Sequence, residues 1–138
     1  MENHSLDEES KQELAFKASL IEQHMQELAE RLEYISHQLS ELEGFSKNME
    51  FMKDAKSKEM FASLGRGIYA KSSLEDNNLF VNVGAGIIVK KTPEETLKII
   101  EQQIKNFHEA KVSLMAQLEI YQGLMNQALA QAEKKRKE

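Results

Sequence analysis

A seam of apolar residues that repeats every seven positions constrains most tightly how this chain can fold. Between residues 14 and 42, apolar residues follow one another at alternating intervals of four and three positions. No polar residue interrupts this series. This spacing predicts a helix that winds against a partner helix through one narrow face. The seam consists of Leu14, Ala18, Ile21, Met25, Leu28, Leu32, Ile35, Leu39 and Leu42.

A second seam of the same kind occupies the C-terminal third of the chain. It follows Thr92-Pro93-Glu94-Glu95, in which a capping Thr, a Pro at the first helical position and a Glu three residues after the cap predict a helix start. Lys111 is its one charged member, and its stem can pack while its ammonium group reaches solvent. The seam consists of Leu97, Ile100, Ile104, Phe107, Lys111, Leu114, Leu118, Tyr121, Met125, Ala128 and Ala132.

The segment between the seams contains one pattern twice. Residues 64–71 and 83–90 both read apolar, Gly, any residue, Gly, Ile, two further residues and Lys. Two glycines around one residue predict a tight turn, because Gly adopts positive φ at no steric cost. The runs that follow each turn are rich in β-formers, so the sequence predicts two β-hairpins between residues 59 and 91.

These observations predict an α+β fold, mainly α, in which an antiparallel two-helix coiled coil is joined by two β-hairpins. We expect a single domain over 1–138, with helices at 6–55 and 92–134 and the hairpins at 59–91. Similar seam lengths place Leu42 near Leu97 and Leu14 near Met125. Two-stranded hairpins are marginal alone and leave open edges, so we expect them to form an oligomerisation platform completed by other subunits.

Composition argues against several classes of function. The chain has no Cys, which excludes disulfides and thiolate metal sites, and its four His share no i, i+4 spacing. Residues 1–60 carry 14 acidic and seven basic residues, which disfavours nucleic acid as the main partner. We find no nucleophile with a partnered base, so we expect no enzyme, no cofactor and no metal. The absence of a long apolar run or a signal peptide predicts a cytoplasmic, non-membrane protein.

Two letter patterns invite other interpretations. Gly65-Arg66-Gly67-Ile68-Tyr69-Ala70 matches the dinucleotide fingerprint G-x-G-x-x-A. That fingerprint requires a helix after the glycines, whereas a β-rich run follows here, so nucleotide binding is disfavoured. The basic run of residues 134–137 is typical of a solvated helix C-terminus, although a nucleic-acid or nuclear address is an alternative.

Apolar residues outside the seams gather toward one end of the predicted coiled coil. Phe16 and Leu20 lie outside the first seam, near its start. Leu124 and Leu129 lie outside the second seam, near its end. Scattered exposed apolar side chains are ordinary, which is one interpretation. The other is an apolar binding patch at the tip of the helical arms, favoured because two separate segments supply it.

The order long helix, two hairpins, long helix resembles the archaeal-type alpha subunit of prefoldin, over roughly residues 10–135. The most specific residues are Ala62 to Gly67, Val81 to Gly86, Lys90 and the helix start at Thr92. Ser63 stands where the family often has Pro, and Gly44 is unusual for a rigid arm.

The resemblance implies an ATP-independent chaperone subunit in a hexamer of two alpha and four beta subunits. In that family the tips hold non-native polypeptide and deliver it to a group II chaperonin. The tip residues would then be Phe16, Leu20, Leu124, Met125 and Leu129. The oligomerisation hairpins would use Leu64, Gly65, Gly67, Ile68, Ala70, Val83, Gly84, Gly86, Ile87 and Val89. The alternative is an oligomeric coiled-coil scaffold or tether that binds a specific folded partner.

Overall fold

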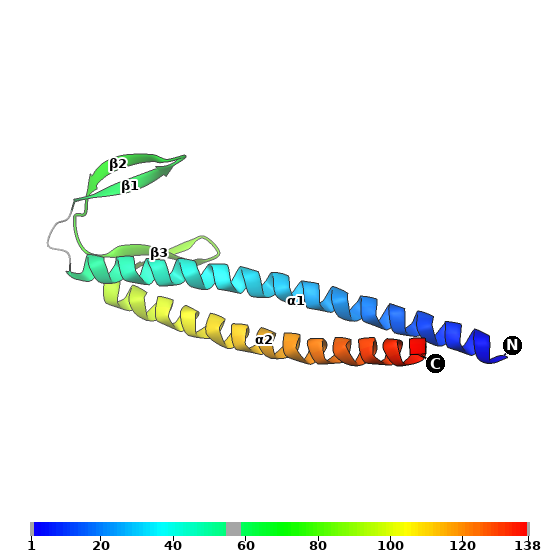
Figure 1. Ribbon diagram of the computed structural model, residues 1–138. Helices are drawn as coiled ribbons and strands as arrows, with labels where there is room; N and C mark the ends of the chain where they lie inside the picture. The colour runs from blue at the N-terminus through cyan, green and yellow to red at the C-terminus, as the bar shows by residue number, and fades with distance from the viewer. Residues whose placement is uncertain (1, 55–58, 138) are drawn as a thin grey trace. The chain divides into compact units, whose positions relative to one another are not determined.

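A computed structural model describes residues 2–54 and 59–137 of the 138-residue chain (Figure 1). It contains two long helices and two antiparallel β-hairpins, so the predicted fold class is confirmed. In chain order the elements are α1 (Glu2–Asp54), β1 (Glu59–Gly65), β2 (Ile68–Ser73), β3 (Leu79–Gly84), β4 (Ile87–Lys91) and α2 (Pro93–Lys137).

The chain divides into two compact units, and each long helix contributes to both. The helix-pair unit combines the residues up to 38 with those from 107 onward. The hairpin unit comprises residues 39–106 and contains all four strands.

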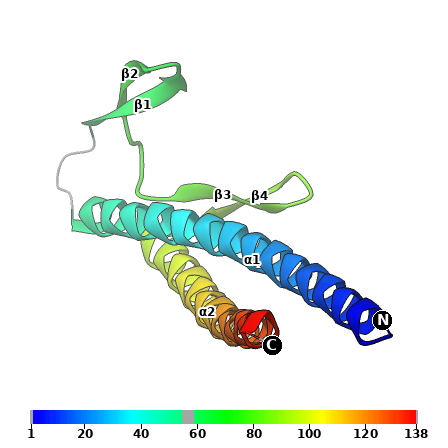
Figure 2. The same ribbon diagram turned by 45° about the vertical axis from the view of Figure 1, so that its right-hand side comes forward.

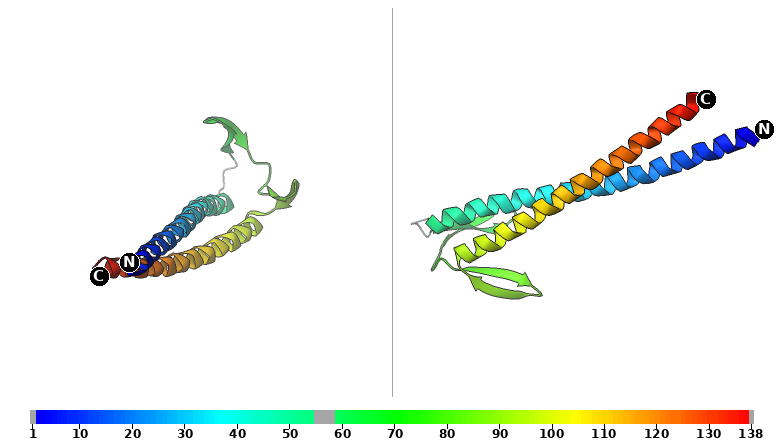
Figure 3. Two further views of the ribbon diagram at one scale, coloured as in Figure 1. Left: turned by 90° about the vertical axis from the view of Figure 1, so that its right-hand side faces the viewer. Right: turned by 90° about the horizontal axis from the view of Figure 1, so that it is seen from below.

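In the helix-pair unit, α1 and α2 lie side by side and run in opposite directions (Figure 3). Their seam residues form the core: Ile21, Leu28, Leu114 and Ala128 are buried. The other predicted seam positions in this unit are half-buried, apart from Ala132, which is exposed. Burial of one narrow stripe on each helix is what a heptad repeat produces.

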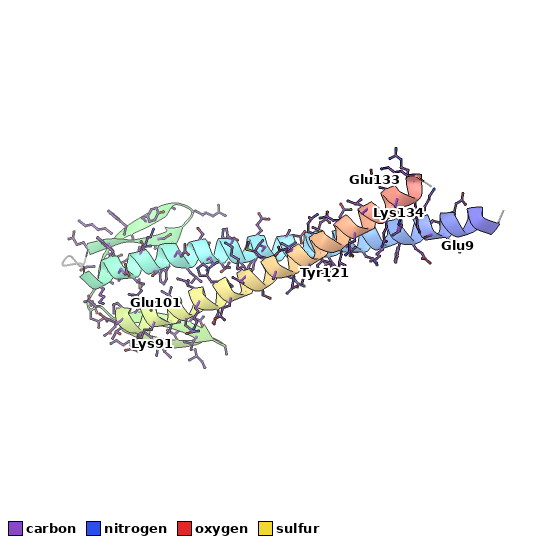
Figure 4. All side chains as sticks on the ribbon, turned by 60° about the horizontal axis from the view of Figure 1, so that its bottom comes forward. Glu9, Lys91, Glu101, Tyr121, Glu133 and Lys134 are labelled. Atoms are coloured by element: carbon purple, nitrogen blue, oxygen red, sulfur yellow. The ribbon has the colours of Figure 1, made fainter. Side chains whose placement is uncertain are left out.

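The pairing register differs from the predicted one. The ring of His24 stacks on that of Tyr121, with centroids 5.4 Å apart (Tyr121 is labelled in Figure 4). Leu14 lies against a hollow that Ala128, Leu129 and Ala132 also line, so the predicted pairing of Leu14 with Met125 is wrong. The offset is about one to two helical turns.

The hairpin unit has a small core of its own, formed by both long helices and β3. Met49, Leu97 and Ile100 form a buried cluster, and partly buried side chains pack against it. The α1 seam therefore continues past Gly44 to Met49, and Leu42, which was expected near Leu97, packs against the same cluster. A heptad repeat matches itself after each shift of seven, so the seam alone does not select the pairing. The surrounding side chains are Leu42, Met52, Leu79 and Ile104.

Helix α2 begins with the capping geometry that its sequence predicts. The Glu95 backbone N–H donates to Thr92 Oγ1 at 3.1 Å, and the Thr92 hydroxyl donates to Glu95 Oε1 at 3.2 Å. The Thr96 backbone N–H donates to the Thr92 carbonyl oxygen at 2.9 Å. The Glu95 bond satisfies a backbone donor that a helix N-terminus otherwise leaves unpaired, and the Thr96 bond is the first regular bond of the helix.

The two hairpins, drawn in Figure 2, close through turns with nearly the same φ values. Arg66 and Gly67 have φ values of 54° and 76°, and Ala85 and Gly86 have 50° and 74°. Positive φ at both central residues is typical of a type I′ turn, whose twist suits a hairpin. The preceding Gly65 and Gly84 also have positive φ, and the pairing register shifts beside each of them.

A side chain two residues before each bulge supports it. Asn82 Oδ1 accepts a hydrogen bond from the Gly84 N–H at 2.9 Å. Ser63 Oγ accepts a longer one from the Gly65 N–H, at 3.4 Å. The polar residue that interrupts each apolar strand thus stabilises the turn that follows it.

Candidate functional site

The end of the helix-pair unit where α1 starts and α2 finishes carries an apolar hollow of about 430 Å³. We name it the terminal hollow. Four alanines form much of its wall, and their small side chains leave space that larger seam residues would fill. Its lining residues are Lys11, Leu14, Ala15, Ala18, Ala128, Leu129, Ala132 and Arg136.

Two cations mark one end of the terminal hollow. Lys11 is the first α1 residue of the lining and Arg136 is the last from α2. Because the helices are antiparallel, the first lining residue of one lies near the last of the other. The hollow thus has a basic end and an apolar remainder, an arrangement that suits an apolar group beside an anion.

The structure separates the five predicted tip residues. Phe16 and Leu129 are 68% and 58% exposed, and Leu20 and Leu124 are 42% and 38% exposed. Met125 is half-buried in the seam. Of the five, only Leu129 lines the terminal hollow.

Helical geometry explains the separation. Residues five apart differ by about 140° around a helix, so Leu124 and Leu129 lie on different flanks of α2. Phe16 and Leu20 are four apart and share one face of α1, which differs from the face of Leu14. The exposed apolar residues thus form two surfaces: the terminal hollow with Leu129, and an outer strip that includes Phe16 and Leu20.

Lys11, Ala15 and Arg136 were missed because the search from sequence was for large apolar side chains. The available signal was small residues: Ala15 and Ala18 recur on α1, and Ala128 and Ala132 on α2, each near its helix end. Only their pairing across the two helices turns these alanines into a hollow.

A second apolar surface lies on the hairpins. Among the predicted oligomerisation residues, Leu64, Ile68, Val83 and Ile87 are exposed, whereas Ala70 and Val89 are half-buried. The four glycines shape the turns, with positive φ at each. Further exposed apolar side chains on the same strands are Phe61, Tyr69, Phe80 and Ile88.

The second hairpin is supported by the helices. Residues of β3, including Leu79 and Val81, line a hollow of about 340 Å³ together with Phe45 of α1 and Ile99 of α2. Val81 pairs with Val89 across the hairpin, and both are half-buried. One face of this sheet is therefore partly covered within the chain, while Phe80 and Ile88 of the other face remain exposed.

One carboxylate in the hairpin unit has a shifted pKa. Asp76 Oδ1 accepts a hydrogen bond from the Asn78 backbone N–H at 3.0 Å, and Lys90 Nζ lies 3.7 Å from Oδ2. The hydrogen bond first, and the Lys90 charge after it, lower the pKa of Asp76 below its ordinary value of 3.8. Both groups are exposed, and their arrangement is that of a structural turn rather than of a catalytic pair.

Within residues 2–54 and 59–137, no group of three or more His, Asp or Glu is arranged to hold a metal ion. Across the same residues, no helical stretch is long and apolar enough to cross a bilayer.

Comparison with known proteins gives a consistent result. The family model "Prefoldin subunit" matches residues 21–138. Prefoldin subunit alpha 1 of Thermococcus kodakarensis is 29% identical over 98 residues, which cover 70% of this chain and 67% of the relative. Prefoldin subunit alpha of Pyrococcus horikoshii is 26% identical over 102 residues, covering 72% and 69% of the two chains.

A solved structure shares the fold. A cryo-EM structure of filamentous PFD from Methanocaldococcus jannaschii superposes with a TM-score of 0.69. It covers 87% of this chain and 98% of the compared one, at 17% sequence identity.

Proposed function

The chain belongs to the prefoldin family as a prefoldin-type chaperone subunit, and from this premise we propose that it captures non-native polypeptide at the terminal end of its helix pair, without ATP. We further propose that it works in a cytoplasmic hexamer of two alpha and four beta subunits, which delivers the captured polypeptide to a group II chaperonin. The single observation that best supports capture is the pair of exposed apolar surfaces at this end, on otherwise charged helices.

The surfaces fit weak and general binding. Each offers only a few apolar side chains, so one contact has low affinity, and several subunits that hold one polypeptide gain avidity together. Unfolded chains differ in sequence but share exposed apolar groups, which such surfaces bind without a fixed geometry. Release then needs no nucleotide, because every single contact is weak.

The hairpins support the proposed assembly. Two-stranded sheets with open edges and exposed Ile68, Ile87 and Ile88 offer both backbone partners and apolar area to other subunits. Membership of the family supports association with other prefoldin subunits, and the two-to-four stoichiometry is part of the proposal.

The test is suppression of aggregation. The wild-type chain, purified with its partner subunits, should keep several unrelated unfolded proteins in solution. A Phe16→Ser, Leu124→Ser double variant should lose most of this protection, because it removes exposed apolar area from this end. Val112→Ser is a matched control: Val112 is 68% exposed on the same unit but lies far along α2 from the terminal hollow.

Two results would count against the proposal. If the double variant assembles and still protects as the wild type does, Phe16 and Leu124 do not hold the polypeptide. If the wild type binds one folded partner and protects no unfolded protein, the scaffold interpretation replaces the chaperone one.

A further inference from the structure

We propose that the terminal hollow selects polypeptide segments in which a carboxylate lies beside large apolar side chains. This inference rests on the proposed capture of polypeptide and adds a preference by chemical class. It starts from the one feature that separates the hollow from the outer strip, namely that Lys11 and Arg136 line it together with apolar residues.

The apolar part of the hollow sets the first requirement. Its volume of about 430 Å³ lies within the range of roughly 300–1,000 Å³ that is usual for ligand sites. Leu14 and Leu129 offer apolar contact, while the small side chains of Ala15 and Ala18 leave depth. A large aliphatic or aromatic side chain fits this space better than a polar one, because the apolar part offers a polar side chain no hydrogen-bond partner.

The basic end sets the second requirement. Lys11 and Arg136 come from different helices and line the same hollow, each as the residue of its helix nearest the helix end. A carboxylate placed there can pair with the Arg136 guanidinium and the Lys11 ammonium while the neighbouring side chain enters the hollow. Charge complementarity therefore identifies the occupant as an acidic-apolar segment of polypeptide.

The expected preference is modest. Glu8 and Glu133 each lie three positions before one of the cations, on the neighbouring turn, and compete for it. Both cations are also exposed, where an ion pair contributes little and salt screens it. We expect a two- to five-fold difference in affinity, by the usual size of an exposed pair.

The experiment compares two dye-labelled, unstructured peptides that differ in one residue, one with an Asp-Phe-Leu core and one with Asn-Phe-Leu. Affinity for the assembled chaperone is measured by fluorescence anisotropy at low salt. The Asp peptide should bind about two- to five-fold more tightly. The difference should vanish in a Lys11→Gln, Arg136→Gln double variant, to which the Asp and Asn peptides should bind with equal affinity.

The chain offers a control with the same change in net charge. Lys17 follows Lys11 by six residues and Lys134 precedes Arg136 by two, so both point away from the hollow's flank by helical geometry. Lys17→Gln with Lys134→Gln (Lys134 is labelled in Figure 4) should preserve the preference for the Asp peptide. If this control removes the preference as fully as the first pair does, general charge attraction explains it and the proposed site is wrong.

Occupancy can be read directly at Ala15. The chain contains no native Cys, so Ala15→Cys provides a single thiol in the lining. The Asp peptide should slow alkylation of this thiol. A thiol that is already protected in the peptide-free assembly would mean that another subunit covers the hollow, which would overturn the proposal.

The remaining outcomes separate this inference from the proposed function. If both peptides bind equally and aggregation is still suppressed, capture stands and the acidic preference is wrong. If neither peptide binds and no aggregation is suppressed, the proposed function itself fails and the inference falls with it.

Discussion

At the scale of single residues, the hairpin unit depends on a few backbone conformations and on hydrogen bonds between residues two positions apart. Arg66 and Ala85 adopt positive φ without being glycine, which costs each about 1–2 kcal/mol. Ser63 and Asn82 offset such costs locally, since each accepts a hydrogen bond from a backbone N–H two residues later, at the start of its turn. The turns are therefore specified by polar side chains as well as by glycine.

The pKa of Asp76 gives a prediction at this scale. Because the folded-state pKa is lowered, the charged form is favoured by folding, and this contribution is complete above about pH 4, the ordinary unfolded value. It is lost as the pH falls through the lowered pKa. In an NMR titration, the Asn78 amide resonance should move with a midpoint below 3.8, and Lys90→Gln should raise that midpoint.

Asp76→Asn serves as the control for this titration. Its side-chain oxygen can still accept from the Asn78 N–H but does not titrate, so the Asn78 shift should become flat over the same pH range. A midpoint at or above 3.8 in the wild type would show that the hydrogen bond is not made in solution.

At the scale of elements, glycine has opposite effects in the helix and in the turn. Gly44 lies within α1, where Gly costs about 1 kcal/mol relative to Ala, and no atom would obstruct an added Cβ. Gly86 also has open space around it, but its φ of 74° disfavours any Cβ. The same substitution therefore has opposite expected signs at the two sites.

Gly44→Ala should raise the free energy of unfolding by about 1 kcal/mol, and Gly86→Ala should lower it by about 1–2 kcal/mol. Urea unfolding followed by circular dichroism at fixed protein concentration measures both, since assembly makes stability depend on concentration. If Gly44→Ala proves destabilising, the missing side chain at residue 44 has a packing role in the assembly.

At the scale of the whole molecule, the hairpin surfaces and the terminal end have separate expected roles. The hairpin surfaces carry Ile68 and Ile87, which are exposed at equivalent positions of the two repeated hairpins. The terminal end of the helix pair carries the terminal hollow. If the two roles are independent, a change on one surface should leave the other function intact.

Ile68→Ser with Ile87→Ser tests the assembly role. Each buried Ile contributes about 1.5–3 kcal/mol when an interface covers it, so the double variant should lose the hexamer. Native mass measurement of the co-purified subunits should give two alpha and four beta chains for the wild type and smaller species for the variant. Val112→Ser, which exchanges another exposed apolar side chain, should retain the full assembly. An intact hexamer in the double variant would show that these hairpin residues do not hold it.

The sequence by itself determined the elements of this protein and their chemistry. Heptad spacing selected the residues that become buried, from Ile21 to Ala128, because a period of 3.5 residues places them on one helical face. The repeated glycines determined both turns, since positive φ is a local property. The cap at Thr92 was equally local, and it formed as predicted.

Only the tertiary structure decided which residues of one helix face which residues of the other. A heptad repeat is compatible with several shifts, and in the hairpin unit Met49 packs with Leu97 and Ile100. In the helix-pair unit, the pairing of the helices sets Leu14 and Ala15 in one lining with Ala128 and Leu129, which forms the terminal hollow. The same lining includes Lys11 and Arg136, residues far apart in the chain that no local pattern brings into one site.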